Sequence, residues 1–501
     1  MKHGLLKNLH RNNSILKNIG CQYPIIRDCC TETGKAMKSI ERNFARIVEI
    51  DFRFKASLVF ISSIWYLALF PGRLGFDYSE SIRMMQSGES TDWWTASFWW
   101  FLKITSFNGT TIMVSSAISL FILGYALFYL SESVVSTRMS NRKALIVFFC
   151  SPLYGGFGLN VSHDVFIAAG ILLFTGFHIR HLVKKNLVTN SDLMAILVGG
   201  LLLITTHYGP FIIAMNVFLF LFRRLYKFGF LLLGLSTFAF FVSGFGVTQV
   251  PKHGLVLPII GDLKCVAQHP QAEISRAEWE ELLAIAPKSE WKNQTKCSQV
   301  DVGFRAMPSL VLADVTLTPN LIKTYLGIAG RNAAIVAMAH IQRASIALPP
   351  PFFDGPQNQV VLNPDLPIGL GTNTALQSYA GVLHPSIDEP SVANKISYLK
   401  ILEVPAQGLI FIINQASWFW GWGGLWLWPI GVYCLVYFKR RYEGSLFPLL
   451  SGTLILHGLL LIFSDALPRY VMSTIILGNL LTLIMIFDLY AKYIKRDGRP
   501  L

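Results

Sequence analysis

Charged residues are scarce in this sequence, and the short motifs of most soluble enzymes are missing. Asp, Glu, Lys and Arg make up 14% of the 501 residues, whereas roughly a quarter of the residues in a soluble protein are charged. There is no P-loop, no G-x-G-x-x-G after a strand, no H-E-x-x-H and no G-x-S-x-G. No D-x-D pair is present to hold a metal and a nucleotide-sugar diphosphate, which disfavours a nucleotide-sugar donor at the cytoplasmic face. The composition places the chain outside the soluble class.

Hydrophobic residues make up 52% of the chain and gather in runs that are long enough to cross about 30 Å of hydrocarbon. The runs lie at 56–71, 111–130, 144–158, 164–179, 192–207, 210–222, 228–248, 418–438, 446–464 and 470–489. The mean hydropathy of +0.47 agrees with this distribution. We therefore expect an α-helical integral membrane protein with about ten transmembrane helices.

Lys and Arg set the expected orientation, because basic loops stay in the cytoplasm. With about ten spans at these positions, every basic cluster falls on the same side. The clusters are the N-terminal arm and residues 138–143, 180–185, 223–227, 439–441 and 492–499. The net charge of +14 is therefore mainly a topology signal, and no aromatic-basic module accompanies it that would indicate nucleic-acid binding. Both termini are predicted to be cytoplasmic.

The runs divide the chain into four regions. Residues 1–55 form a basic cytoplasmic arm that is too long and polar for a signal peptide and suits contact with anionic membrane lipids. Residues 56–250 form a transmembrane module of about seven spans, with its first outer loop at 72–105. Residues 251–405 form a soluble, mixed insert outside the membrane, and residues 406–501 add an interfacial helix and the last three spans.

The insert contains two further signals. A helix-like segment begins at Ser275, and a long loop rich in Pro, Gly and Asn covers about 348–390, which we interpret as a lid that contacts substrate. Of the seven cysteines, only Cys265 and Cys297 fall in this outward region. Their spacing suits no zinc pattern, and an oxidising compartment favours a disulfide between them.

Polar side chains converge at the outer ends of the spans. They are Asp77 after the first span, His163 and Asp164 before the fourth, His207 and Tyr208 after the fifth, and Asp465, Arg469 and Tyr470 between the last two. The topology puts them at one membrane depth, where an ionisable group has to be maintained against a desolvation cost. Such a ring could supply a base and a phosphate-binding cation for a reaction between a lipid-anchored donor and an extracytoplasmic acceptor.

Each of these residues also has a structural interpretation. Asp77 and Asp164 could cap helix N-termini, and His163 and His207 could extend their rings to interfacial water. Arg469 could be an interfacial anchor, although it lies on the side where basic residues are disfavoured. The tryptophans at 93–100 and 418–428 suit the aromatic belt of a membrane protein, with contact to a sugar or polyprenyl chain as the alternative.

Three motifs resemble those of bacterial multi-spanning glycosyltransferases of the GT-C type, which take sugars from polyprenyl-phosphate carriers on the outer face of the inner membrane. They are Phe70–Asp77, Asn160–Phe166 and Asp465–Tyr470, and the stretches 261–270, 320–325 and 339–343 add to the similarity. The resemblance covers the chain from about Ser57 onward. It identifies the superfamily better than the substrate.

The resemblance implies transfer of a sugar from a polyprenyl-phosphate-linked donor to a lipid-linked or cell-surface glycan. It implies that Asp77 is the catalytic base, with Asp164 and Glu80 as further acidic candidates. It also implies a cation at the donor phosphate, which we assign to Arg469, with Tyr470, His163 and His207 as further substrate-binding candidates. It leaves open whether a divalent cation takes part, and it assigns no metal ligand.

Two other classes use similar residues. A lipid or solute transporter or flippase also uses intramembrane charges, but it favours broken helices and charges near the midplane. A membrane-bound O-acyltransferase needs a histidine buried in a span, for which His457 is the candidate.

We expect extracellular labelling reagents to modify a cysteine placed at Ser275 but not one placed at Ser445, because the basic clusters put these positions on opposite sides of the membrane. The measurement is cysteine accessibility in intact cells, with permeabilised cells as the control. Labelling of both positions from outside, or of Ser445 alone, would contradict the topology.

Overall fold

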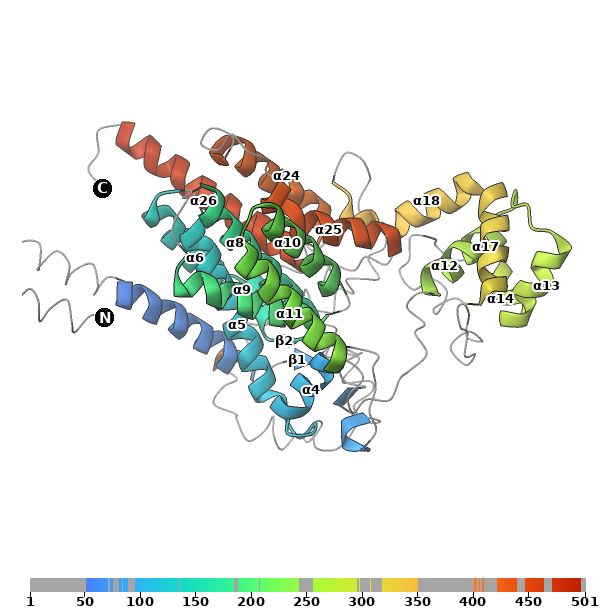
Figure 1. The fold of residues 1–501 in the computed structure, drawn as a ribbon, viewed down its shortest axis with the longest axis horizontal. Coiled ribbons are helices and arrows are strands. Elements are labelled where there is room, and N and C mark those ends of the chain that lie inside the picture. Colours follow the sequence, from blue (N-terminus) through green and yellow to red (C-terminus); the bar gives the residue numbers. More distant parts are fainter. Residues whose placement is uncertain are drawn as a thin grey trace, which may run out of the picture. The chain divides into compact units, whose positions relative to one another are not determined.

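The structure is a computed structural model, and it describes residues 51–70, 73–74, 81–82, 84–88, 95–134, 136–183, 188–206, 208–242, 256–294, 297, 307, 318–349, 401–402, 405, 408–409, 421–438, 447–463 and 471–496. The chain divides into two compact units, Met1–Phe60 and Ile61–Leu501. The described residues are mostly helical (Figure 1). Their one sheet consists of two short strands, β1 (Arg73–Leu74) and β2 (Asn160–Val161).

Helices occupy the places where apolar runs predict spans. The first covers residues 51–68. The others are α5 (Met113–Ser133), α6 (Arg138–Cys150), α7 (Pro152–Gly158), α8 (His163–Val183), α9 (Asn190–Ile204), α10 (Gly209–Phe222), α11 (Tyr226–Val242), α24 (Gly423–Tyr433) with the π-helical turn η5 (Cys434–Phe438), α25 (Phe447–Phe463) and α26 (Met472–Arg496). Among the described residues, Met113–Ser133 and Met472–Ile494 are long and apolar enough to cross a membrane. The number of about ten spans stays a prediction.

The run at 144–158 differs from the single helix that its hydropathy predicts. It contains the end of α6 and all of α7, separated at Ser151, whose backbone is extended with φ −76° and ψ 145°. Pro152 follows at the first position of α7. A proline ring disfavours helical backbone in the residue before it and suits the first turn of a new helix, so the break follows from the sequence Ser-Pro.

Helix α8 is surrounded by its neighbours. Residues 163–179 are all buried, and α5, α9, α25 and α26 pack against it. Two glycines allow close approach: a Cβ atom at Gly170 would lie 2.7 Å from Cγ of Leu203 on α9, and one at Gly176 would lie 2.9 Å from Cδ1 of Tyr129 on α5. Small residues at helix crossings permit this packing. The packing of these neighbouring helices therefore holds the first turn of α8, which carries His163 and Asp164.

Two buried carboxylates connect helices next to the basic clusters. Asp192 accepts a 2.7 Å hydrogen bond from the Tyr129 hydroxyl and lies 3.3 Å from the Arg180 guanidinium, which joins α9 to α5 and α8. Asp488 on α26 accepts a 2.9 Å bond from the Ser136 hydroxyl just before α6. Both carboxylates are nearly inaccessible to solvent. Buried carboxylates need such partners, so these contacts fix the neighbouring helix ends.

Residues of the insert form a helical cluster with its own core. Its helices are α12 (Leu257–Gln268), α13 (Arg276–Ile285), α14 (Lys288–Lys292), α17 (Pro319–Arg331) and α18 (Ala333–Arg343). Trp291 is fully buried at the centre, and its indole N–H donates to the carbonyl of Leu282 at 2.8 Å. The helix predicted from Ser275 is α13, which Ser275 and Glu278 begin with a capping box. These helices therefore pack around a core of their own, and the extent of the soluble insert stays a prediction.

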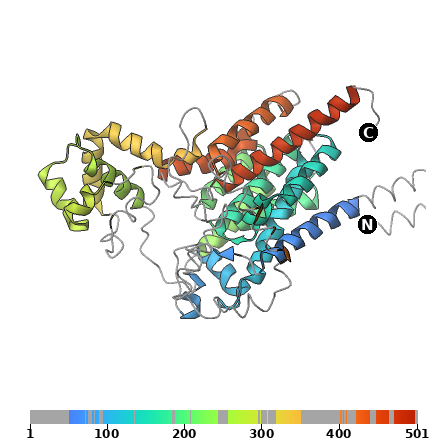
Figure 2. The same ribbon diagram turned by 180° about the vertical axis from the view of Figure 1, so that it is seen from behind.

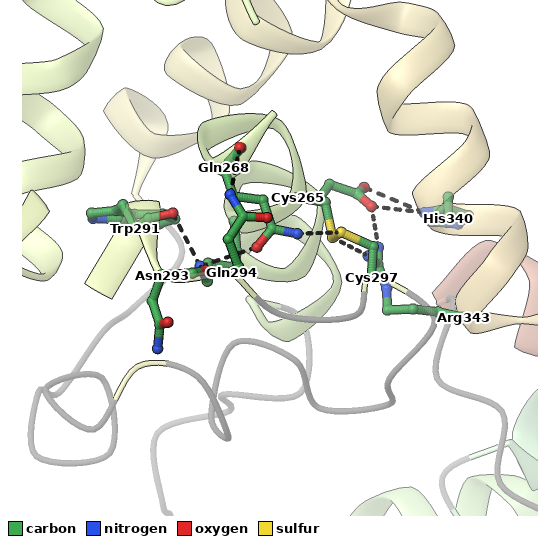
Figure 3. Close-up of a disulfide and its surroundings, with 10 residues drawn as sticks. Cys265, Gln268, Trp291, Asn293, Gln294, Cys297, His340 and Arg343 are labelled. Carbon is green, nitrogen blue, oxygen red and sulfur yellow. Dashed lines mark hydrogen bonds and ion pairs between the residues drawn. A yellow bond between two sulfur atoms is a disulfide. The ribbon is translucent and has the colours of Figure 1, made fainter. Parts of the chain in front are cut away.

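Cys265 on α12 and Cys297 form a disulfide, with their Cα atoms 5.7 Å apart (Figure 3). The predicted pairing is confirmed. The bond joins α12 to the chain segment after α14 across a sequence separation of 32 residues. It therefore holds the chain at Cys297 against α12.

We expect Cys297→Ser to lower the stability of the insert by about 3–4 kcal/mol, because the crosslink restricts the unfolded chain over a loop of this size. Proteolysis of the insert at increasing urea concentration measures this change. Cys150→Ser is the matched control, since Cys150 is a free cysteine in α6. Peptide mapping that found Cys265 and Cys297 as free thiols in protein from its native membrane would contradict the pairing.

Candidate functional site

The two strands pair residues that precede Asp77 and Asp164 in the sequence. β1 and β2 are parallel, with Arg73 opposite Asn160 and Leu74 opposite Val161. Asp77 lies four residues after Arg73, and Asp164 lies four residues after Asn160. Neighbouring strands are about 4.8 Å apart. Because the strands are parallel, the two chain segments continue from the same end of the sheet. In the sequence, each segment has an aspartate four residues after the first paired residue.

Asp164 lies in the first turn of α8 and has an exposed fraction of only 2%. The imidazole Nε2 of His163 is 3.4 Å from Oδ1 of Asp164, and His163 is 3% exposed. A carboxylate in the first turn is favoured by the partial positive charge of the helix N-terminus. The structural interpretation as a helix-terminal acid therefore fits Asp164. Its burial beside His163 also fits a functional acid, so the geometry is compatible with both.

Helix α4 (Ala96–Thr105) covers the start of α8. The ring of Phe98 contacts the rings of His163 and Phe166 with centroids 5.9 and 5.8 Å away. Trp99 is 1% exposed, and its indole nitrogen has no hydrogen-bond partner among the described residues. Because Trp99 packs inside the protein, the membrane-belt interpretation does not apply to this tryptophan.

The start of α4 is tied to the end of α9. The Thr95 hydroxyl donates to the carbonyl of Thr205 at 2.6 Å, and the Ser97 hydroxyl donates to the carbonyl of Ile204 at 3.2 Å. His207 follows two residues after Thr205. The chain just before His207 is therefore joined to the predicted first outer loop, to which α4 belongs. Only the positions of Ser and Thr hint at this contact, and the sequence alone did not identify it.

Several predicted site residues lie outside the described residues. They are Asp77, Glu80, His207, Asp465, Arg469 and Tyr470. The segment with Asp465 and Arg469 connects α25 to α26, and both helices pack against α8. Val471, the first described residue after this segment, is fully buried, and a Cβ atom on Gly423 would lie 2.4 Å from its Cβ. The roles of these residues remain predictions.

A second polar centre in the insert was missed as a site, although its sequence stretches belong to the resemblance. Asp262 on α12 is 1% exposed and is paired with the buried guanidinium of Arg343 on α18. The Tyr325 hydroxyl donates to Asp262 at 2.9 Å, and Nδ1 of His340 lies 3.3 Å from the same oxygen. Figure 3 shows His340 and Arg343 near the disulfide. Burial, with the neighbouring carboxylate, raises the pKa of Tyr325. The signals in the sequence were the resemblance of these stretches and the charges of Asp262 and Lys264 among apolar neighbours.

Lys264 supports the chain around the disulfide. Its side chain is fully buried, and its ammonium donates to the carbonyl of Trp291 at 3.0 Å and to the carbonyl of Asn293. Burial lowers the pKa of Lys264 to about 8. Carbonyl oxygens can satisfy a buried ammonium, so Lys264 holds the end of α14 against α12 and has a structural role.

The described residues do not decide whether the protein binds a metal ion. In the part of the chain that the structure describes, no three His, Cys, Asp or Glu side chains lie close enough together to hold a metal ion. Asp77, Glu80 and Asp465 lie outside that part. Whether a divalent cation takes part in the reaction therefore stays open.

Comparison with known proteins gives little similarity. No family model and no curated protein sequence matches the chain. Among solved structures, the archaeal oligosaccharyltransferase AglB from Archaeoglobus fulgidus, in complex with an inhibitory peptide and a dolichol-phosphate, matches with 12% identity and a TM-score of 0.32. The match covers 90% of this chain and 52% of that chain, so this chain spans about half the length of AglB. At this TM-score the likeness supports no assignment of fold or function.

Proposed function

We propose that this protein is a membrane glycosyltransferase that moves a sugar from a polyprenyl-phosphate-linked donor to a lipid-linked or cell-surface glycan. In this proposal it lies in the bacterial inner membrane with its site on the outer face. The observation that carries the proposal is the register of β1 and β2, which starts the segments of Asp77 and Asp164 side by side. In this proposal Asp77 and Asp164 act at one place, where two acidic groups can serve general acid–base chemistry.

The proposed reaction is a displacement at the anomeric carbon of the donor. Asp77 accepts the proton of an acceptor hydroxyl, whose oxygen forms the new bond to the sugar. The bond between the sugar and the phosphate oxygen breaks, and the polyprenyl phosphate leaves with the electron pair. Arg469 then stabilises the charge that develops on the phosphate, because a guanidinium can bind two phosphate oxygens at once.

The surroundings of Asp164 support the proposal. The buried start of α8 holds Asp164, and α4 covers it with aromatic side chains. Glu80 is the remaining acidic candidate on the Asp77 segment. In this proposal the aromatic side chains keep water from the donor, which strengthens electrostatic interactions with its charge. Tyr470, His163 and His207 are further candidates for donor or acceptor contacts.

A lipid or solute transporter is the second candidate, and one feature of the last spans favours it. Helix α24 contains Pro429 in its interior and continues into the π-helical turn η5. Interrupted helices occur at the binding sites of transporters. Surface glycan composition, compared by mass spectrometry between a deletion strain and its parent, distinguishes the two, since only an enzyme forms a new glycosidic bond. A redistributed lipid with no missing sugar would favour the transporter.

We expect Asp77→Asn to reduce the transfer rate roughly 10²–10⁴-fold while membrane insertion stays normal, because an amide cannot act as a general base near neutral pH. The amide keeps a capping oxygen, so a purely capping role predicts near-normal activity. The measurement is glycan modification in the deletion strain at matched expression. Asp51→Asn is the control, because Asp51 forms a 3.4 Å ion pair with the exposed Lys55. An ordinary rate in Asp77→Asn would move the base to Asp164 or Glu80.

We expect Arg469→Ala to raise the donor concentration needed for half-maximal rate by about tenfold or more, with partial recovery in Arg469→Lys. The reason is that lysine acts as a point charge where arginine binds two oxygens. Initial rates at varied donor concentration measure the effect. Arg276→Ala in the insert is the matched control, since the Arg276 side chain is 95% exposed. Unchanged donor dependence in Arg469→Ala would assign Arg469 to membrane anchoring.

A further inference from the structure

His340 connects the insert to the end of a predicted span. It lies on α18, and Figure 2 shows this helix leading from the insert toward α25. Nδ1 of His340 is 3.3 Å from Oδ2 of Asp262, and its Nε2 is 2.7 Å from the carbonyl oxygen of Leu461. Leu461 belongs to the last turn of α25, whose carbonyls have no partners within the helix.

Both groups that face the ring nitrogens are acceptors. An ionised carboxylate and a carbonyl can only accept hydrogen bonds, and a neutral imidazole has a single N–H to donate. The ring makes both contacts at once only as the imidazolium. The hydrogen bond with Asp262 is the main cause that raises the pKa of His340 above its ordinary value of 6.5. A positive charge also suits the C-terminus of α25.

Among the residues that the structure describes, few charged groups lie around His340. Asp262 faces it from α12, Tyr325 contacts the same carboxylate from α17, and Arg343 lies one turn further along α18. Helix α25 contains no Asp, Glu, Lys or Arg. Its histidine, His457, is bonded elsewhere, to the carbonyl of Ala347 and to the hydroxyl of Thr474. Protonation of His340 is therefore governed mainly by Asp262, with Arg343 opposing it.

The same part of α25 receives the chain that leaves the insert. The imidazole of His457 donates to the carbonyl of Ala347 at 2.7 Å, and the Trp422 indole donates to the carbonyl of Leu348 at 2.8 Å. These bonds fix the chain after α18 against α24 and α25, and His340 adds a contact at the last turn of α25. The sequence after α25 leads directly to Arg469.

We propose that His340 is a positioning residue that fastens the insert to the C-terminal turn of α25, the helix that precedes Arg469 in the chain. This inference rests on the proposed function, because Arg469 matters here as the ligand of the donor phosphate. Loss of His340 leaves Asp262 bonded to Arg343 and Tyr325. The core of the insert does not include His340. The effect of a substitution is therefore concentrated at the end of α25.

The test uses the full-length protein reconstituted in lipid nanodiscs. His340→Phe removes both hydrogen bonds, and His340→Lys keeps a positive charge with several donors. His269→Gln, a histidine on the same insert that lies just after α12, is the control. Hydrogen exchange of the peptide covering residues 455–463 reports on α25, and the rate at varied donor concentration reports on donor use.

We expect exchange of this peptide to be about tenfold faster in His340→Phe, with an apparent KM for the donor raised by a similar factor and a smaller change in kcat. His340→Lys and His269→Gln should stay near wild type. Because the folded-state pKa is raised, the contribution of His340 is complete below about pH 6.5 and is lost as the pH rises through the folded-state value. Exchange-rate ratios between wild type and His340→Lys should therefore grow above about pH 6.5.

Equal exchange in His340→Phe and wild type would overturn the inference even if the protein transfers sugar. Faster exchange with unchanged donor dependence would also overturn it, since the contact would then have no effect on the site. If exchange changes as expected while the wild-type protein transfers no sugar from any polyprenyl-phosphate donor, the contact to α25 is supported and the proposed function fails. The two ideas are therefore tested separately.

Discussion

The parallel register of β1 and β2 is the constraint on which the candidate site depends. Arg73 pairs with Asn160, and a slip of one residue would turn the side chains of one strand to the opposite face. A ladder of two residue pairs is too short to be stable by itself. Its partners supply the stability: Asn160 and Val161 are buried, and α5 packs against β2. The helix bundle therefore determines the register that starts the two acidic segments together.

Helix α8 follows β2 directly and connects it to the rest of the helix bundle. Its burial on all sides requires small residues at the crossings, and Gly170 and Gly176 provide them. At one end it carries His163 and Asp164, and at the other Arg180 is held by Asp192. A carboxylate that is buried and partnered resists rotation or displacement of the helix. The acidic end of α8 is thus located by packing along its whole length and by an ion pair at its far end.

The sequence predicted the features that depend on local pattern or composition. Helices lie in the apolar runs, α13 begins at Ser275, and Cys265 pairs with Cys297. It did not predict the bonds from Thr95 to Thr205 and from His340 to Leu461, because these partners are backbone carbonyls, which every residue has. The carbonyl that His340 contacts is 121 positions away. Such pairings depend on how the helices pack, and hydropathy contains no information on them.

The buried ion pair of the insert costs desolvation free energy, so its presence calls for a reason other than stability. Burying Asp262 and Arg343 requires removing both charges from water, and an apolar pair of similar volume is often equally stable or more so. What the charged groups add is hydrogen bonds to particular partners, which an apolar contact does not specify. Asp262 receives donors from α17 and α18, including Arg343 of α18, and through His340 it extends the network to the backbone of α25. An apolar core could hold α12, α17 and α18 together, but it could not bind a particular carbonyl at a helix end. The network therefore favours a defined position of the insert relative to α25.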